Sequence, residues 1–168
     1  MFSMSNAVVK SEIAYMLAKV VLAKKKNKPT ICHYSSLYRA TIDYFDENGL
    51  DMDGLGKHSY RLYVPNDEVL DKMTKEMNVD DDFITNEFNY IIEKIRLAKG
   101  KESICHYSYL QINTLKKLAT MGIKYETLGQ HSYKFFYPEA KSKAWYRLIN
   151  YGKVKRNADG SFAKKNVA

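Results

Sequence analysis

The chain has 168 residues, 45% of them hydrophobic, and carries a formal net charge of +8 at pH 7. This length suits one ordinary domain or two small ones, and the hydrophobic fraction is large enough to fill a core. No segment approaches the roughly 20 apolar residues of a membrane-spanning helix, so we expect no contact with a membrane. The chain has only 2 Cys, which excludes a disulfide framework and favours a reducing, cytoplasmic setting. The short N-terminal apolar stretch is interrupted by charges and does not predict a signal peptide.

The first predicted element is a helix over residues 11–26, because apolar residues recur at helical spacing along one of its faces. A second helix is predicted over residues 36–48, between Ser35 and Gly49. Serine before a helix and glycine after it are preferred capping residues. An alternating apolar pattern then predicts a β-hairpin.

The second half of the chain predicts the same succession of elements. A helix is predicted around Phe88, and a further helix over residues 109–121 lies between Ser108 and Gly122. The following hairpin is predicted to turn around Leu128-Gly129, where two alternating arms meet.

One face of each second hairpin arm is the more apolar one, and it begins with a histidine. In the second half this face carries His131, Tyr133, Phe135 and Tyr137. A third helix is predicted after each hairpin, over residues 67–77 with Asn66 as N-cap and over residues 139–150.

These elements occur twice because the sequence repeats itself. The segment Ile31–Ser35 recurs as Ile104–Ser108, and Leu55–Tyr60 recurs with one difference as Leu128–Tyr133, both at an offset of 73 residues. Repetition at a fixed offset predicts tandem duplication of one small module. The predicted regions are a first repeat module at 1–78, a second at 79–151 and a basic, disordered tail at 152–168.

The helix, helix, hairpin, helix order resembles the winged-helix family, in which a recognition helix precedes a wing. In the first copy the resemblance rests on Leu37–Thr41, Gly49-Leu50 and Gly56–Leu62. The second copy offers the matching segments Leu110–Thr114, Gly122-Ile123 and Gly129–Phe135. The fold class that follows is a mostly helical α+β protein with an internally duplicated α-α-β-hairpin-α module.

The positive charge is concentrated toward the C-terminus. Residues 66–86 contain 2 basic and 7 acidic residues, whereas residues 139–168 contain 8 basic and 2 acidic residues. Clustered positive charge is typical of proteins that bind polyanions, although it also occurs on a merely solvated basic tail.

A nucleic-acid interface is one interpretation of the repeated residues. Lysine and arginine on the second helices and the wings would contact phosphates, while glutamine and tyrosine would contact or stack on bases. The acidic second helix of the first copy favours the second copy as the binding half. The candidate nucleic-acid-binding residues are Arg39, Lys57, Arg61, Lys116, Lys117, Gln130, Lys134, Lys153, Lys155 and Arg156.

A structural role is the other main interpretation of the histidine motifs. Buried polar groups need hydrogen-bond partners, and a satisfied network between the start of the second helix and the hairpin would help to specify one packing. The candidate network residues are His33, Tyr34, His58, Tyr60, His106, Tyr107, His131 and Tyr133, with Ser35 beside the first histidine.

Two further interpretations concern chemistry. The doubled His-Tyr-Ser motif resembles that of two-histidine phosphoesterases, a resemblance that would make His33 and His106 the acid and base, with Ser35 and Ser108 holding phosphate. Cysteine and histidine are also zinc ligands, but neighbouring side chains diverge and the standard ligand spacings are missing, so we expect no metal and no cofactor.

The sequence therefore predicts a non-enzymatic regulatory or accessory protein that binds nucleic acid, most readily double-stranded DNA. Small, basic, duplicated proteins of this kind resemble viral or phage accessory factors. The main alternative is a protein-binding adaptor or inhibitor, whose acidic segment Asp80-Asp81-Asp82 engages a basic partner.

Overall fold

A computed structural model describes residues 6–100 and 103–152 of the chain. Within these residues the fold is α+β, with six helices, two small three-stranded antiparallel sheets, and about half of the positions helical. The first half contains α1 (Ala7–Lys25), β1 (Thr30–His33), α2 (Arg39–Glu47), β2 (Met52–Gly56), β3 (Ser59–Tyr63) and α3 (Asp67–Glu76). The second half contains α4 (Phe83–Ala98), β4 (Ser103–His106), α5 (Ile112–Thr120), β5 (Tyr125–Gly129), β6 (Ser132–Phe136) and α6 (Lys143–Asn150).

The two sheets have the same topology. The strand order is β1-β3-β2 in the first and β4-β6-β5 in the second, so the last strand of each hairpin lies in the centre. The register also repeats: Thr30 pairs with Tyr63, and Ser103, 73 residues later, pairs with Phe136. The repeated segment after the first helix of each half therefore forms an edge strand, which the sequence pattern did not assign.

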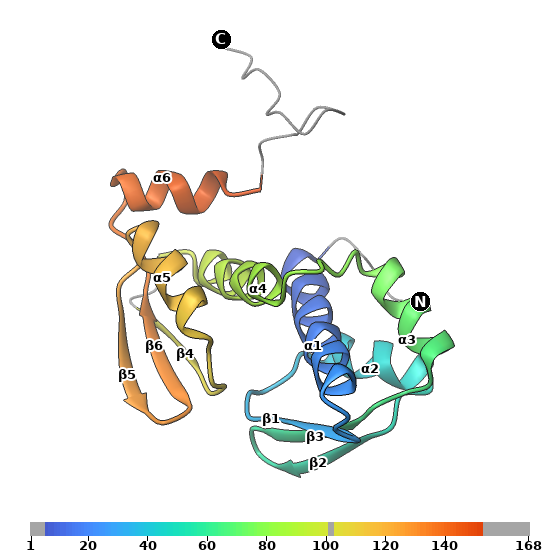
Figure 1. Ribbon diagram of the computed structural model, residues 1–168. Helices are drawn as coiled ribbons and strands as arrows, with labels where there is room; N and C mark the ends of the chain where they lie inside the picture. The colour runs from blue at the N-terminus through green and yellow to red at the C-terminus, as the bar shows by residue number, and fades with distance from the viewer. Residues whose placement is uncertain (1–5, 101–102, 153–168) are drawn as a thin grey trace, which may run out of the picture.

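Helices α1 and α4 cross at the centre of the molecule, and one sheet lies to either side of them (Figure 1). Both are buried around most of their circumference; Ile13 and Leu17 of α1 and Ile91 and Ile92 of α4 are inaccessible to solvent. The buried apolar side chains of the two halves form one contiguous cluster. The halves thus share a single core, and each contributes one long helix to it.

Several predicted helix ends are confirmed. Gly49 and Gly122 follow α2 and α5 with φ of 72° and 85°, a left-handed conformation that costs glycine little. The Asn66 side chain accepts a hydrogen bond from the Val69 amide at 2.9 Å and caps α3.

The predicted serine caps are wrong. Helix α2 begins at Arg39 and α5 at Ile112, three residues later than expected in each case, and neither N-cap residue forms a side-chain cap bond. The Glu12 carboxylate instead accepts the Tyr38 amide hydrogen bond at 2.8 Å, just before α2. Ser35 and Ser108 are buried in the interior.

The predicted hairpin turn also needs correction. Strand β5 continues through Leu128-Gly129, and the two-residue turn is Gln130-His131; its counterpart in the first half is Lys57-His58. Each hairpin histidine therefore lies at the tip instead of on the strand face. The apolar face itself is as expected, because Tyr133 and Phe135 are buried.

The last helix starts later than predicted, at Lys143 instead of residue 139. Lys141 has a φ of 68°, which interrupts a helix, and the Ser142 side chain then caps α6 through the Trp145 amide at 3.1 Å. The predicted tail at 152–168 lies outside the described residues except for Gly152. None of the helices described is both long and apolar enough to cross a bilayer.

Candidate functional site

A cluster of polar side chains lies where the two halves meet. It contains six residue types, each present once in either half at equivalent positions, and most of the twelve side chains are buried. The pairs are Glu12 and Glu87, Tyr15 and Tyr90, Lys19 and Lys94, His33 and His106, Ser35 and Ser108, and Thr41 and Thr114. We call these twelve residues the inter-half cluster.

Local structure explains why these residues converge. Glu12, Tyr15 and Lys19 are spaced i, i+3 and i+7, so they lie on one face of α1, and the same spacing recurs on α4. His33 and His106 end the edge strands β1 and β4 next to these helices. Crossing of α1 over α4 then brings the two sets together (Figure 1).

Hydrogen bonds of the cluster cross from one half to the other. The Tyr90 hydroxyl donates to Glu12 Oε2 at 2.6 Å, and Lys19 Nζ donates to Ser108 Oγ at 3.1 Å. The rings of Tyr15 and Tyr90 stack with centroids 5.1 Å apart. Such buried, charge-assisted hydrogen bonds are the strong ones, so they tie the halves in one arrangement.

The two glutamates also hold the start of the following helix. Glu87 Oε1 accepts from the Gln111 amide at 2.8 Å and from the Thr114 hydroxyl at 2.6 Å, as Glu12 does from the Tyr38 amide. Burial raises the pKa of both carboxyl groups, while these donors act in the opposite direction. Each glutamate therefore links a central helix to α2 or α5.

The lysines and histidines form two equivalent contacts. Lys19 Nζ lies 3.3 Å from His33 Nδ1, and Lys94 Nζ lies 3.2 Å from His106 Nδ1. An ammonium group only donates, so each Nδ1 accepts and the imidazoles are neutral. Burial lowers the pKa of both histidines well below the usual value, and the neighbouring ammonium groups add to the effect. Burial likewise lowers the pKa of each lysine to about 8.

The histidines at the hairpin tips make a second set of contacts between the halves. His131 stacks on Tyr34 with centroids 5.6 Å apart, and His58 stacks on Tyr107 at 4.9 Å. The contacts are reciprocal, as at an isologous interface between identical subunits. The residues that repeat most faithfully in the sequence thus contact the opposite half of the molecule.

The predicted network is therefore assembled differently from the expectation. His33 lies opposite Tyr60, and His106 lies opposite Tyr133, on neighbouring strands of the same sheet in each case. These two pairs agree with the predicted network within each copy. His58 and the other tip histidine instead reach across to the opposite half. The sequence does indicate Glu12 and Lys19, because both recur at helical spacing in the second half. The sequence pattern alone did not link them to the histidines.

The outer helices of the two halves differ in charge. Helices α2 and α3 each carry a net charge of −2, whereas their counterparts α5 and α6 each carry +2. The exposed positions of the two halves thus differ in charge, although the residues of the inter-half cluster are identical in type.

The predicted nucleic-acid-binding residues are distributed over helices, strands and hairpin turns of both halves. Lys116 and Lys117 are exposed on α5 and Lys57 and Gln130 are exposed in the hairpin turns. Lys134 alternates with the buried Tyr133 and Phe135, so it points from the outer face of its sheet.

The other candidates are placed as follows. Arg61 occupies the equivalent outer position on β3, and Arg39 forms an ion pair with Asp43 at 3.0 Å. Lys153, Lys155 and Arg156 lie outside the described residues. Exposed Lys143 and Arg147 of α6 were missed, although the basic C-terminal composition pointed to them; Arg147 contacts the Thr120 carbonyl at 3.3 Å and so lies beside α5.

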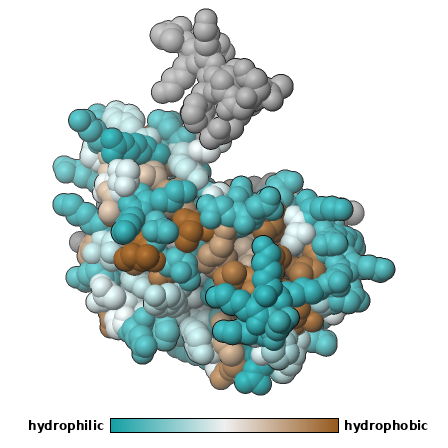
Figure 2. All heavy atoms as spheres, in the orientation of Figure 1, coloured by the Kyte–Doolittle hydropathy of each residue, from teal (hydrophilic) through white to brown (hydrophobic). Residues whose placement is uncertain are grey.

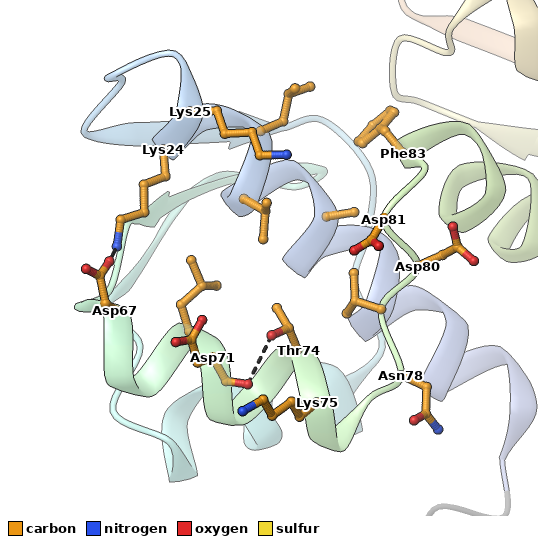
Figure 3. Close-up of a pocket in the computed structure, with 15 residues that line it drawn as sticks. Lys24, Lys25, Asp67, Asp71, Thr74, Lys75, Asn78, Asp80, Asp81 and Phe83 are labelled. Carbon is orange, nitrogen blue, oxygen red and sulfur yellow. Dashed lines mark hydrogen bonds and ion pairs between the residues drawn. The ribbon is translucent and has the colours of Figure 1, made fainter.

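An open groove separates α1 from α3 in the first half, with a volume of about 700 Å³. Its floor is apolar, with Val21, Leu70 and Phe83 among the lining residues, and Asp81 and Lys25 are at its rim (Figure 3). In the space-filling view, brown apolar atoms show between hydrophilic side chains on the side where α1 and α3 lie (Figure 2).

The equivalent junction in the second half is closed by the chain itself. Arg96, at the position of Val21, donates from Nε to the Leu148 carbonyl at 2.8 Å and also contacts the Tyr151 carbonyl. The Tyr151 ring packs edge-on against Phe88 at 5.3 Å. Among the residues that the structure describes, the groove between α1 and α3 therefore has no open counterpart between α4 and α6.

The geometry disfavours both the phosphoesterase interpretation and the zinc interpretation. His33 and His106 are 0% exposed, so a phosphodiester has no approach to them in this conformation. Cys32 and His33 are neighbours on a strand and point to opposite faces. In the described part of the chain, no three His, Cys, Asp or Glu side chains are grouped so that they could hold a metal ion.

No protein-family model, curated protein or solved structure matches this chain.

Proposed function

We infer that the protein is a non-enzymatic nucleic-acid-binding factor whose second half holds the phosphate backbone of duplex DNA. Its two halves are two copies of one winged-helix-like module that arose by tandem duplication, with a regulatory or accessory role of the kind found in phage proteins. The contacts come from the basic outer face of α5 and α6, to which Lys116, Lys117, Lys143 and Arg147 contribute.

The observation that carries this proposal is the opposite charge of equivalent helices. Both halves need soluble outer surfaces, and the first half achieves this with a net negative charge on α2 and α3. Solubility alone therefore gives no reason for the second half to be positive at the same positions. Attraction of a polyanion does, because Lys and Arg that replace condensed counterions supply most of the affinity for nucleic acid.

The order of helices and strands supports the winged-helix resemblance, and one feature departs from it. Residues 34–38, which lead into α2, contain no helix, whereas a typical winged helix has a short helix before its recognition helix. We therefore assign phosphate contacts to α5 and α6 and no groove-reading helix.

Fluorescence anisotropy of labelled duplex DNA over a salt series tests the proposal. Replacement of Lys116 and Lys117 by Ala is expected to weaken binding and to lower the log–log salt slope by about 2, since each phosphate contact contributes about 0.9. The matched control removes two exposed lysines from α3, Lys72 and Lys75, and should leave the slope unchanged. Equal losses of DNA affinity in the two variants would mean that the charge acts only non-specifically. Absence of binding at low salt would overturn the proposal.

A protein-binding adaptor is the second candidate, and the open groove favours it. The linker residues Asp80 and Asp81 line this groove and continue into Asp82, so a basic partner would meet both an apolar floor and negative charge. Salt-insensitive capture of a protein, lost when Val21 is replaced by Arg and accompanied by no retention on DNA, would favour this candidate over the first.

A further inference from the structure

Exposed aromatic side chains lie at both places where a hairpin tip meets the opposite half. Tyr34, Tyr107 and Tyr109 are 44%, 37% and 53% exposed, whereas Tyr15, Tyr90 and Tyr133 are at most 5% exposed. Tyr34 stacks on His131, and Tyr109 meets the same imidazole edge-on at 6.0 Å. We call Tyr34, Tyr107, Tyr109 and the tip histidines His58 and His131 the tyrosine platform.

The platform is held in place before any ligand arrives. Tyr107 stacks on His58 while Tyr34 stacks on His131, so one part of each ring is fixed by a contact with the other half and another part faces solvent. A fixed, half-exposed ring loses little conformational entropy when a ligand stacks on it. These contacts explain how the tyrosines are oriented, but not why such large rings remain exposed.

The platform is continuous with the basic face proposed to hold phosphates. Tyr109 lies just before α5, whose exposed Ile112 and Lys116 follow at helical spacing along one side of the helix. Lys57 borders the platform beside His58 and Gln130 borders it beside His131, because each directly precedes a tip histidine. Lysines therefore flank the aromatic surface on α5, after Tyr109, and beside His58.

We propose that the tyrosine platform stacks against unpaired nucleobases, and that the preferred substrate is a duplex with a single-stranded extension. The proposal rests on the proposed function, since α5 and α6 hold the duplex phosphates while the extension crosses the platform. Bases inside a duplex are already stacked on their neighbours and offer no free face, whereas bases of a single strand stack on aromatic side chains irrespective of sequence. The lysines that border the platform match the backbone charge of such a strand.

The position of Tyr109 makes the platform asymmetric. Its counterpart in the first half is Ser36, so only the end next to α5 carries the additional ring. The extension should accordingly leave the duplex on the side of Tyr109 and run toward the tip histidines. Tyr109 is also the most exposed of the three tyrosines, which makes it the best position for a test.

The experiment uses the full chain and compares a blunt duplex, the same duplex with a single-stranded extension, and the isolated single strand by fluorescence anisotropy. Tyr109→Ala should weaken binding of the extended duplex about fivefold or more, as is usual for loss of one base–aromatic stack. It should leave the blunt duplex unchanged. A 2-aminopurine in the extension should be quenched by the wild-type protein and recover in the variant.

Controls separate this inference from the proposed function. Leu97→Ala removes another exposed large side chain, on α4, and should change none of the three affinities. Tyr34→Phe retains a ring that stacks and should bind the extended duplex like the wild type, and circular dichroism confirms that each variant is folded. Equal affinity for blunt and extended duplexes, unaffected by Tyr109→Ala, would overturn the platform while leaving duplex binding intact. Failure to bind any of the three probes would overturn both.

Discussion

The two halves of this protein are alike where they touch and unlike where they face solvent. Both contribute the same glutamate, tyrosine, lysine, histidine, serine and threonine to the inter-half cluster. Their outer helices carry opposite charge, and one half has an open groove where the other is sealed by Arg96 and Tyr151. Positions that must satisfy each other in the interior have little freedom to change, whereas solvent-facing positions can acquire a separate task in each half.

The largest expected effect comes from a substitution in the inter-half cluster, where the two halves have the same residues. Glu12→Ala removes the acceptor for the Tyr90 hydroxyl and the Tyr38 amide and takes away the negative charge that acts on Lys94. We expect a loss of about 3 kcal/mol in the free energy of unfolding, the usual scale for disrupting a buried charged network.

Denaturant unfolding measures this loss, with Glu126→Ala as the control. Glu126 is exposed on β5 and faces Lys134 at 3.9 Å, so its removal should cost less than about 0.5 kcal/mol. Similar losses for both variants would mean that the cluster does not hold the halves together.

Lowering the pH should destabilise the inter-half cluster before it affects the outer surfaces. The pKa values of His33 and His106 are lowered in the folded state, so below the unfolded value of 6.5 the unfolded chain binds protons that the folded chain does not. As the pH is lowered below about 6.5, the free energy of unfolding should therefore decrease, by at most about 1.4 kcal/mol per pH unit for each histidine.

The raised pKa values of Glu12 and Glu87 act with the opposite sign nearer pH 4.5, so the histidine effect is best isolated just below pH 6.5. Unfolding free energies at successive pH values give the slope. His131→Gln, at an exposed tip, should keep this slope, and a slope of zero in the wild-type protein would contradict the buried, neutral assignment.

Equivalent glycines should respond differently in the two halves. Gly49 and Gly122 both have positive φ, so Ala costs about 1 kcal/mol at either site. A Cβ at Gly122 would lie 2.9 Å from the Ala144 Cβ, whereas one at Gly49 would meet nothing within 4 Å. Gly122→Ala should therefore lose about 1 kcal/mol more than Gly49→Ala, and thermal unfolding of the two variants would show whether α6 packs this closely.

The smallest effect should come from the reciprocal stacks. Tyr107→Leu and Tyr34→Leu each replace a ring that stacks on a tip histidine, and each should cost about 0.5–1 kcal/mol. Because Tyr34 and Tyr107 occupy equivalent positions and each stacks on one tip histidine, the two losses should be of similar size. A large difference between them, measured by denaturant unfolding, would show that the halves do not meet in the same way on both sides.

Much of the fold could be predicted from local pattern. The helical spacing of apolar residues, Asn66 as a cap and Gly49 and Gly122 as helix terminators are short-range features, and the structure contains them. The apolar face with Tyr133 and Phe135 follows from alternation along one strand. Such features depend on neighbours a few residues away, which the chain order itself supplies.

The caps of α2 and α5 and the partners of the tip histidines could not be obtained in this way. Ser35 and Ser108 have the composition of N-caps, but Glu12 and Glu87 reach the helix ends from α1 and α4 and the serines are drawn into the interior. Tertiary contacts override local preference whenever a stronger, charged acceptor is positioned by another element.

The sequence by itself determined the helices, the hairpins and the identity of the repeated residues. Only the tertiary structure decided what the repetition does, because a contact such as Tyr34 with His131 joins positions whose separation in sequence carries no periodic signal. The crossing of α1 and α4 brings the two sets of repeated side chains together, and burial favours hydrogen bonds between them, such as that from the Tyr90 hydroxyl to Glu12.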